Sequence, residues 1–328
     1  MFEGQEDKNL RLFGGVRVEN GAKKTLWDVH EFDADSKEWN SAGVIENAPK
    51  VENPSYLYKP DGALFVYGTN PAAGKEIFLS VDLKELAIKN LKNNPAGLKE
   101  LSPLLDPAKG LVYFFSGVDS LGAGSKKVFA YNIDADSWSE LNVKNPPAAR
   151  RGAAFVINPA GDAIYMFGGA DQAGKFFGDT WSLKLLTGLW SLVPLSPSPQ
   201  PVKDAAFLNA GDFGILISGI LNNGKINREI WHFDLSAPEW IKDLAPVTPS
   251  DRIQAAQVFS PKRRAWYLIG GLRSEINEYS PVSTIIKYSV EEETWTEKHL
   301  KIEGASFVGS AAALDDDNDT VYIHGGVK

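Results

Sequence analysis

The stretch from Arg150 to Pro194 decides the fold, and it reads RRGAAFVINPAGDAIYMFGGADQAGKFFGDTWSLKLLTGLWSLVP. Apolar or alternating runs at 153–157 and 163–167 flank the segment NPAGD, which is typical of a tight turn between two strands. Two further runs of β type follow from Asp179 and from Leu189. None of these runs has the 3.6-residue apolar period of a helix. We therefore predict four antiparallel strands, called a, b, c and d in chain order.

This four-strand pattern is repeated along the chain. One such sheet has two open edges and cannot be an independent domain of this size, so repetition is expected. Three marks recur in register about every 50 residues: glycine after strand b, an aromatic residue in strand c and tryptophan near strand d. The glycine marks are Gly14-Gly15, Gly68, Ser116-Gly117, Gly168-Gly169, Ser218-Gly219, Gly270-Gly271 and Gly325-Gly326. The strand-d tryptophans are Trp39, Trp138, Trp190, Trp240 and Trp295.

The three marks resemble those of the kelch-repeat family, and the resemblance covers essentially the whole chain. Its clearest segments are GDTWSLKLLTGLW and REIWHFDLSAPEW. Two features depart from the family pattern: Gly68-Thr69, Ser116-Gly117 and Ser218-Gly219 replace double glycines, and Arg150-Arg151-Gly152 lacks the histidine common at that point. The resemblance implies an all-β fold, a kelch-type β-propeller of four-stranded antiparallel blades.

We expect residues 1–328 to form a single propeller domain. Five complete blades are predicted at 52–91, 100–141, 150–193, 202–244 and 252–298. Residues 10–42 supply strands b, c and d, and residues 305–327 supply strands a and b, so together they form a composite blade. Closure is expected because an open propeller exposes apolar sheet faces. This favours six blades, with seven as the alternative.

Composition narrows the classes of partner and compartment. The net charge of −8 and the pI of about 5.2 disfavour nucleic acid and anionic membranes as the main partner. The sequence has no cysteine, which excludes disulfides and thiolate chemistry. It shows neither a signal peptide nor an apolar run that could insert into a membrane. These features slightly favour the cytoplasm, with a mature secreted chain lacking its leader as the alternative.

The sequence contains no residue pattern typical of a catalytic or metal-binding site. Copper oxidases of the galactose oxidase type share the blade pattern but need a cysteine, and none is present. The Asp316-x3-Thr320-x3-His324 segment has the wrong middle ligand for the iron site of plant kelch proteins. The acidic run from Asp315 to Asp319 lacks the glycine of a calcium loop and is interpreted as a solvated turn. We predict no catalytic residue, cofactor or metal, which favours a non-enzyme.

Binding is expected at the rim formed by the b–c loops and the d–a connections. These loops are long and mix aromatic with cationic residues, whereas the opposite rim carries short turns such as Lys262-Arg263-Arg264. The candidate partner-binding residues are Lys126, Arg150, Arg151, Lys175, Phe176, Phe177, Arg228, Arg252, Arg273 and Tyr279. Such a rim suits an acidic protein or peptide.

Two functional classes remain open at this point. A non-catalytic scaffold for protein–protein interaction is favoured because no catalytic constellation is visible. A carbohydrate-binding or sugar-modifying propeller is the alternative, and it would need carboxylates, arginine and aromatic faces that converge in one pocket.

Overall fold

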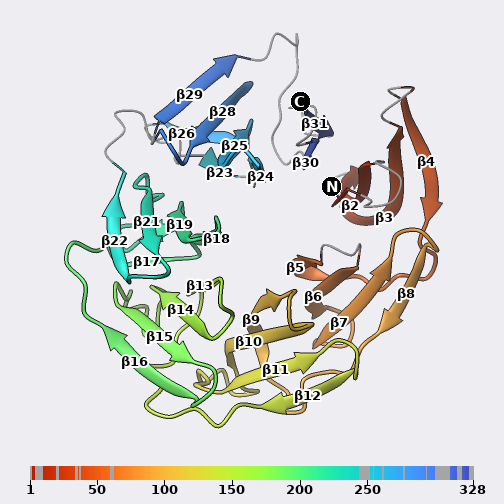
Figure 1. Cartoon of the computed structure of the whole chain (residues 1–328). Coiled ribbons are helices and arrows are strands. Elements are labelled where there is room, and N and C mark those ends of the chain that lie inside the picture. The colour runs from red at the N-terminus through yellow and green to blue at the C-terminus, as the bar shows by residue number, and fades with distance from the viewer. Residues whose placement is uncertain are drawn as a thin grey trace. The chain divides into compact units, whose positions relative to one another are not determined.

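The computed structural model describes residues 2–3, 10–19, 22–33, 36, 38–59, 63–243, 252–253, 255–260, 262–275, 278–292, 294–299, 311–315 and 320–324. Their regular structure is entirely β, in strands β1 to β31 (Figure 1). No helix that could cross a membrane occurs in these ranges. The chain divides into two compact units, Met1–Asn142 and Val143–Lys328, and each is described by itself.

The first unit holds three antiparallel four-stranded sheets, each formed from consecutive strands. The N-terminal sheet comprises β1 (Phe2–Glu3), β2 (Leu10–Glu19), β3 (Ala22–Asp33) and β4 (Glu38–Val44). The second comprises β5 (Glu52–Tyr58), β6 (Leu64–Asn70), β7 (Lys75–Asp82) and β8 (Ala87–Asn90). The third comprises β9 (Lys99–Asp106), β10 (Leu111–Val118), β11 (Val128–Asn132) and β12 (Ser137–Glu140).

The second unit also contains three four-stranded antiparallel sheets. The sheet of the defining stretch comprises β13 (Ala154–Ile157), β14 (Ala163–Phe167), β15 (Thr180–Lys184) and β16 (Leu189–Val193). The next comprises β18 (Ala206–Asn209), β19 (Phe213–Ile217), β21 (Trp231–Asp234) and β22 (Glu239–Lys242). The last comprises β24 (Ala256–Ser260), β25 (Ala265–Ile269), β28 (Thr284–Ser289) and β29 (Thr294–His299).

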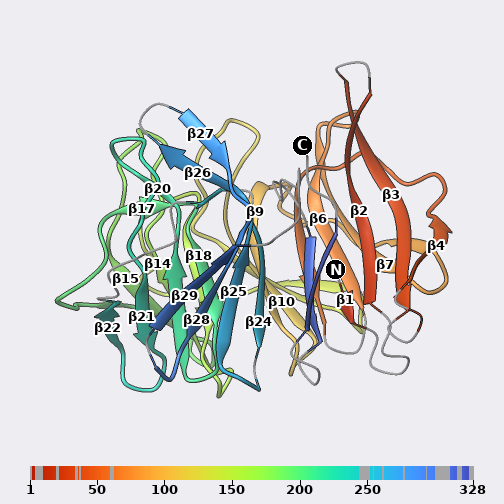
Figure 2. The same cartoon turned by 90° about the horizontal axis from the view of Figure 1, so that it is seen from above.

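Smaller sheets accompany these in the second unit. Two of them lie in the loops: β17 (Val202–Lys203) with β20 (Ile220–Leu221), and β23 (Arg252–Ile253) with β26 (Leu272–Glu275) and β27 (Glu278–Pro281). Figure 2 shows both at the same end of the four-stranded sheets of this unit. A C-terminal hairpin pairs β30 (Ala311–Asp315) with β31 (Thr320–His324).

The prediction of four-stranded antiparallel blades is confirmed, but the blade count is corrected. The structure describes five blades with the expected repeat, which match the five complete blades predicted, in place of a ring of six or seven. The sheet β1–β4 departs from the repeat because its first strand has 2 residues while β2 and β3 have 10 and 12. β1 pairs with Leu10 and Arg11 at the edge of β2. The composite blade of residues 10–42 and 305–327 and the single domain stay predictions.

Within each unit, neighbouring blades pack against each other through large apolar side chains. Three strand-d indoles also donate a hydrogen bond to the preceding blade. Trp138 Nε1 donates to the carbonyl of Lys92 at 2.6 Å, and Trp240 Nε1 donates to Thr180 Oγ1 at 2.8 Å. Trp295 Nε1 donates to the Asp243 carboxylate at 3.0 Å. Each indole therefore buries apolar area and satisfies its polar group across a blade junction.

The glycines after strand b allow two chain segments to approach closely. Gly168 has φ +72° and Gly169 has φ +91°, which is the left-handed region. A Cβ atom added to Gly168 would lie 2.3 Å from the carbonyl oxygen of Val202, so no side chain fits there. Ser116 and Ser218 take the first glycine position of two other blades at φ +65° and +60°. The backbone conformation is thus retained where the double glycine is not.

Candidate partner-binding surface

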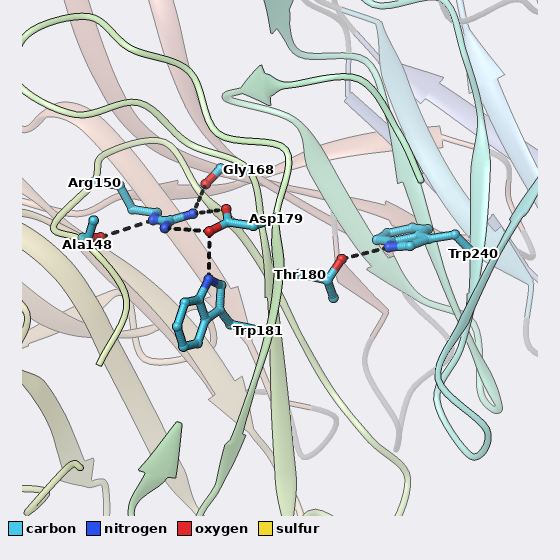
Figure 3. A network of polar contacts seen from close by, with 7 residues as sticks. All are labelled: Ala148, Arg150, Gly168, Asp179, Thr180, Trp181 and Trp240. Atoms are coloured by element: carbon cyan, nitrogen blue, oxygen red, sulfur yellow. Dashed lines mark hydrogen bonds and ion pairs between the residues drawn. The ribbon is translucent and has the colours of Figure 1, made fainter. Parts of the chain in front are cut away.

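Arg150 lies inside the molecule and holds two blade segments together (Figure 3). Its side chain forms an ion pair with Asp179, with 2.5 Å between Nη1 and Oδ1, and Nη1 also donates to the carbonyl of Gly168 at 3.0 Å. Nε donates to the carbonyl of Ala148 at 3.1 Å, and the guanidinium lies 4.0 Å from the ring centre of Phe177. Asp179 in turn accepts a hydrogen bond from Trp181 Nε1 at 2.7 Å.

The prediction that Arg150 contacts a partner is therefore wrong. Only 3% of its surface is exposed, and its guanidinium donors are directed at groups of this chain. Phe177 is half-buried because one face of its ring covers that guanidinium. Arg150 therefore supports the surface from inside, while the contact of Phe177 with a partner stays a prediction.

Backbone hydrogen bonds join the loops around this network into one surface. The loop between β14 and β15 bonds to the segment before β13 through Arg151 and Ala170, at 2.8 and 2.9 Å in the two directions. It bonds to β17 on its other side, where Gly169 N donates to the carbonyl of Val202 at 2.8 Å. β17 pairs with β20, whose hairpin reaches Lys225. Four sequence segments thus become one contiguous rim.

This rim exposes cationic and aromatic side chains. We define the cationic rim surface as Arg151, Lys175, Phe176, Lys203, Lys225 and Arg228. Lys203 Nζ lies 5.7 Å from the ring centre of Phe176, and Lys175 Nζ lies 5.7 Å from that of Phe177. Four acids belong to these segments: Asp171 accepts a hydrogen bond from Lys175 N, Asp204 lies 3.7 Å from Lys203 Nζ, Asp179 is paired with Arg150 and Glu229 with Lys242. The cations outnumber these acids, against a net charge of −8 for the chain.

The other predicted residues belong to other segments of the chain. Arg252 and Arg273 face each other in the pairing of β23 with β26, and Tyr279 lies opposite Ser274 in β27. The side chains of Arg252 and Tyr279 lie outside the described residues. Arg273 forms an ion pair with Glu297, with 3.2 Å between nitrogen and oxygen. Lys126 is exposed in the first unit.

Sequence reasoning missed Lys203. This residue follows a proline-rich connection, and its place beside Phe176 is set by the pairing of β17 with β20. Strands of two residues show no alternating pattern. The sequence therefore offered one signal for Lys203, its position between two long loops.

The turn residues of the opposite rim are placed as predicted. Lys262, Arg263 and Arg264 form the turn between β24 and β25. The acidic residues 316–319 fall between β30 and β31 but lie outside the described residues. Within the described ranges, no three His, Cys, Asp or Glu side chains gather in a group that could hold a metal ion.

Acidic groups near the rim are held as carboxylates by neighbouring donors. Burial alone would raise the pKa of Asp179, but the hydrogen bonds from Arg150 and Trp181 outweigh it and lower the pKa. Glu229 behaves alike: burial opposes ionisation, and hydrogen bonds from Lys242 and Trp231 give a net lowering of its pKa. An acid kept protonated for catalysis would need the opposite direction of shift.

Comparison with known proteins finds similarity to kelch-repeat proteins. The family model described as the KLHDC2/KLHL20/DRC7 Kelch-repeats domain matches residues 107–326. Kelch domain-containing protein 10 of Rattus norvegicus is 26% identical over 209 residues, which is 59% of this chain and 49% of that protein. Multiple epidermal growth factor-like domains protein 8 of Homo sapiens is 23% identical over 188 residues, which is 55% of this chain and 6% of that protein.

The solved structures include one titled "Structure of YjhT", which aligns with a TM-score of 0.61 at 18% identity. The alignment covers 81% of this chain and 88% of that one, and at this identity it bears on the fold alone. This chain spans about half or less of the length of the two curated relatives above.

Proposed function

Because this chain belongs to the kelch-repeat family, we propose that it is a non-catalytic scaffold that binds a protein partner through the cationic rim surface. The partner segment is acidic. The proposal takes up the favoured sequence interpretation, with Arg150 as a support of the surface and Lys203 added to it.

One observation carries the proposal: the excess of exposed cations on backbone-bonded loops of an acidic protein. Arg151, Lys175, Lys225 and Arg228 are exposed on segments that are fixed by backbone hydrogen bonds. A rigid loop scaffold lowers the entropy lost on binding. A partner of opposite charge associates faster with this cationic surface. The acidic surfaces elsewhere on the chain repel the same partner, so it does not dock there.

Phe176 supplies the apolar contact that charge alone lacks. It is half-buried next to Lys203, so one part of the ring is anchored and the rest faces outward. Aromatic residues are enriched at the buried centres of protein interfaces. The acids near the rim, Asp179 and Glu229, have lowered pKa values, which favours the scaffold over the sugar-modifying alternative.

The test uses the full chain as bait in extract of the native source, followed by mass spectrometry and a binding titration with the purified partner. Phe176→Ala combined with Lys203→Glu is expected to weaken binding at least tenfold, about 1.4 kcal/mol, without changing the thermal midpoint. Binding should also weaken with rising salt.

The matched control reverses two cations of the opposite turn, Lys262→Glu with Arg263→Glu. This variant should bind the partner as the unmodified chain does. Loss of binding in the control with full binding by the loop variant would place the partner on the other rim and refute the proposal.

A further inference from the structure

A small cavity lies between two neighbouring blades of the second unit, away from the cationic rim surface. It has a volume of about 100 Å³ and is lined by His232, Lys242, Asp243, Arg264, Tyr288 and Val290. Ile241 is also part of its wall and is 43% exposed, so the cavity reaches the protein surface. Walls with this many polar groups are typical of a binding pocket rather than a packing defect, which is apolar.

The polar groups of the cavity wall are held in fixed positions. The Tyr288 hydroxyl lies 2.6 Å from His232 Nε2, and both residues are buried. The side chain of Asp243 is 2% exposed, and its Oδ2 lies 4.0 Å from the same imidazole nitrogen. Trp295 Nε1 donates to Oδ2 at 3.0 Å and orients the carboxylate. An aspartate, a histidine and a tyrosine thus line one small space.

The repeat shows that the arginine of this cavity is not required by the fold. In four blades, the residue after strand c donates its backbone N–H to the turn between strands a and b. The accepting residues are Gly110, Asp162, Asp212 and Arg264, so these are structurally equivalent. Arg264 has φ +45° and Gly110 has φ +62°, which places an arginine in a conformation that glycine adopts without strain.

Such strain persists where a side chain is needed for another reason. The guanidinium of Arg264 takes part in no ion pair with the rest of the described chain, although Arg150 and Arg273 both do. Among the described residues this lining cation has no fixed counter-ion, which suits it to pair with a ligand.

The histidine and the aspartate also differ from their equivalents. His232 lies three residues before the bonded residue Leu235, and the corresponding residues in the three other blades are Ala130, Ser182 and Lys287, so histidine occurs here alone among the four. The indole that binds Asp243 needs no carboxylate, because Trp138 makes the equivalent bond to a backbone carbonyl. Side chains that the blade does not require therefore meet in one cavity.

We propose that this cavity binds a small carboxylate that carries a hydrogen-bond donor on the adjacent carbon. Arg264 pairs with the ligand carboxylate, the geometry in which guanidinium groups bind most strongly. The Asp243 carboxylate accepts the hydrogen bond of the adjacent hydroxyl or ammonium group. A plain anion lacks this donor and meets Asp243 as a like charge, which makes it the poorer ligand.

The volume sets the size of the ligand. A cavity of about 100 Å³ has room for several water molecules, so it accommodates a molecule of a few heavy atoms. Lactate and alanine have this size and chemistry, whereas acetate has the carboxylate alone. These three compounds are the probes, and lactate and alanine distinguish a hydroxyl donor from an ammonium donor.

The test is isothermal titration of the full chain with L-lactate, L-alanine and acetate. Lactate or alanine is expected to bind with Kd of about 1 mM or below, at least tenfold more tightly than acetate. Arg264→Gly is expected to weaken that binding at least tenfold without lowering the thermal midpoint, because glycine is the residue of the equivalent turn. Asp243→Asn is expected to abolish the preference over acetate.

The control is Lys262→Gly, which changes an exposed cation of the same turn and should leave the affinity unchanged. Equal affinity for Arg264→Gly and the unmodified chain overturns the proposal, as does the absence of binding by both lactate and alanine at 10 mM, roughly ten times the expected Kd. This outcome is independent of the scaffold function, since no variant touches the cationic rim surface.

Discussion

Arg150 and Arg151 are neighbours in the sequence but have different environments. Arg150 is 3% exposed and paired with Asp179, whereas Arg151 is exposed on the rim. We predict that Arg150→Met lowers the free energy of unfolding by about 2 kcal/mol. The value is below that of fully buried pairs because the Asp179 side chain is 30% exposed. Urea denaturation measures it.

Arg151→Met is the matched control, because it removes the same charge one residue away. It is expected to change the free energy of unfolding by less than about 0.5 kcal/mol. Equal losses in both variants would show that the Arg150–Asp179 pair contributes nothing specific to stability.

The same pair makes part of the stability pH-dependent. The pKa of Asp179 is lowered in the folded chain from its ordinary value of 3.8, so its contribution is complete above that value. The contribution is lost as the pH falls through the folded pKa. We predict that the cost of Arg150→Met is constant at neutral pH and shrinks below about pH 4. Urea titrations at pH 7, 5 and 3 measure this cost, and one that is unchanged at pH 3 would contradict the prediction.

At the scale of elements, the junction after strand b depends on glycine for two separate reasons. Gly168 has a positive φ and also faces the Val202 carbonyl, where a Cβ atom would lie 2.3 Å away. Gly174 has φ +84° but nothing within 4 Å of an added Cβ atom. We predict that Gly174→Ala costs about 1 kcal/mol of strain, while Gly168→Ala costs at least about 2 kcal/mol more because β17 must move. Thermal and urea denaturation give both values.

The two variants form an internal control, since both add one methyl group at positive φ. Equal destabilisation by the two variants would mean that β17 moves away from the added methyl group at residue 168 without loss of unfolding free energy. The larger loss of unfolding free energy expected for Gly168→Ala should be accompanied by weaker binding of the protein partner, because β17 carries Lys203.

The blade strands could be predicted from the sequence because each carries a local signal. The defining stretch predicted strands at 153–157 and 163–167, and the structure has them at Ala154–Ile157 and Ala163–Phe167. The loop sheets could not be predicted in this way. β17 and β20 have two residues each, which is too short for an alternating pattern, and they exist because two loops meet in space.

The candidate site was predicted less completely for the same reason. Loop length and composition identified Arg151, Lys175 and Phe176, but the burial of Arg150 depends on Asp179, which is 29 residues away. The cavity residues were missed because His232, Asp243, Arg264 and Tyr288 come from separate segments of two blades. The signal was present in the repeat, where the position of Arg264 is held by glycine or aspartate and the position of His232 by alanine, serine or lysine in the other blades.

At the scale of the whole molecule, the terminal strands decide whether the sheets stay covered. The C-terminal hairpin packs on the last blade of the second unit, in an apolar cluster that contains Tyr267, Ile269 and Ala312. Val321 and Ile323 of β31 are packed against the same cluster. Removal of residues 306–328 uncovers this face, and an uncovered apolar face with a free strand edge promotes association.

We predict that the chain truncated after residue 305 has a lower thermal midpoint and forms aggregates, because the Tyr267–Ile269 face of the last blade becomes exposed. Light scattering and a thermal melt measure both properties. Ile323→Asn in the full-length chain is the companion variant, since it disturbs the same contact and leaves the chain length intact; it should lower the midpoint by a smaller amount. A truncated chain that remains monomeric with an unchanged midpoint would show that the hairpin is dispensable. It would also refute the role of the C-terminal strands in covering the sheets.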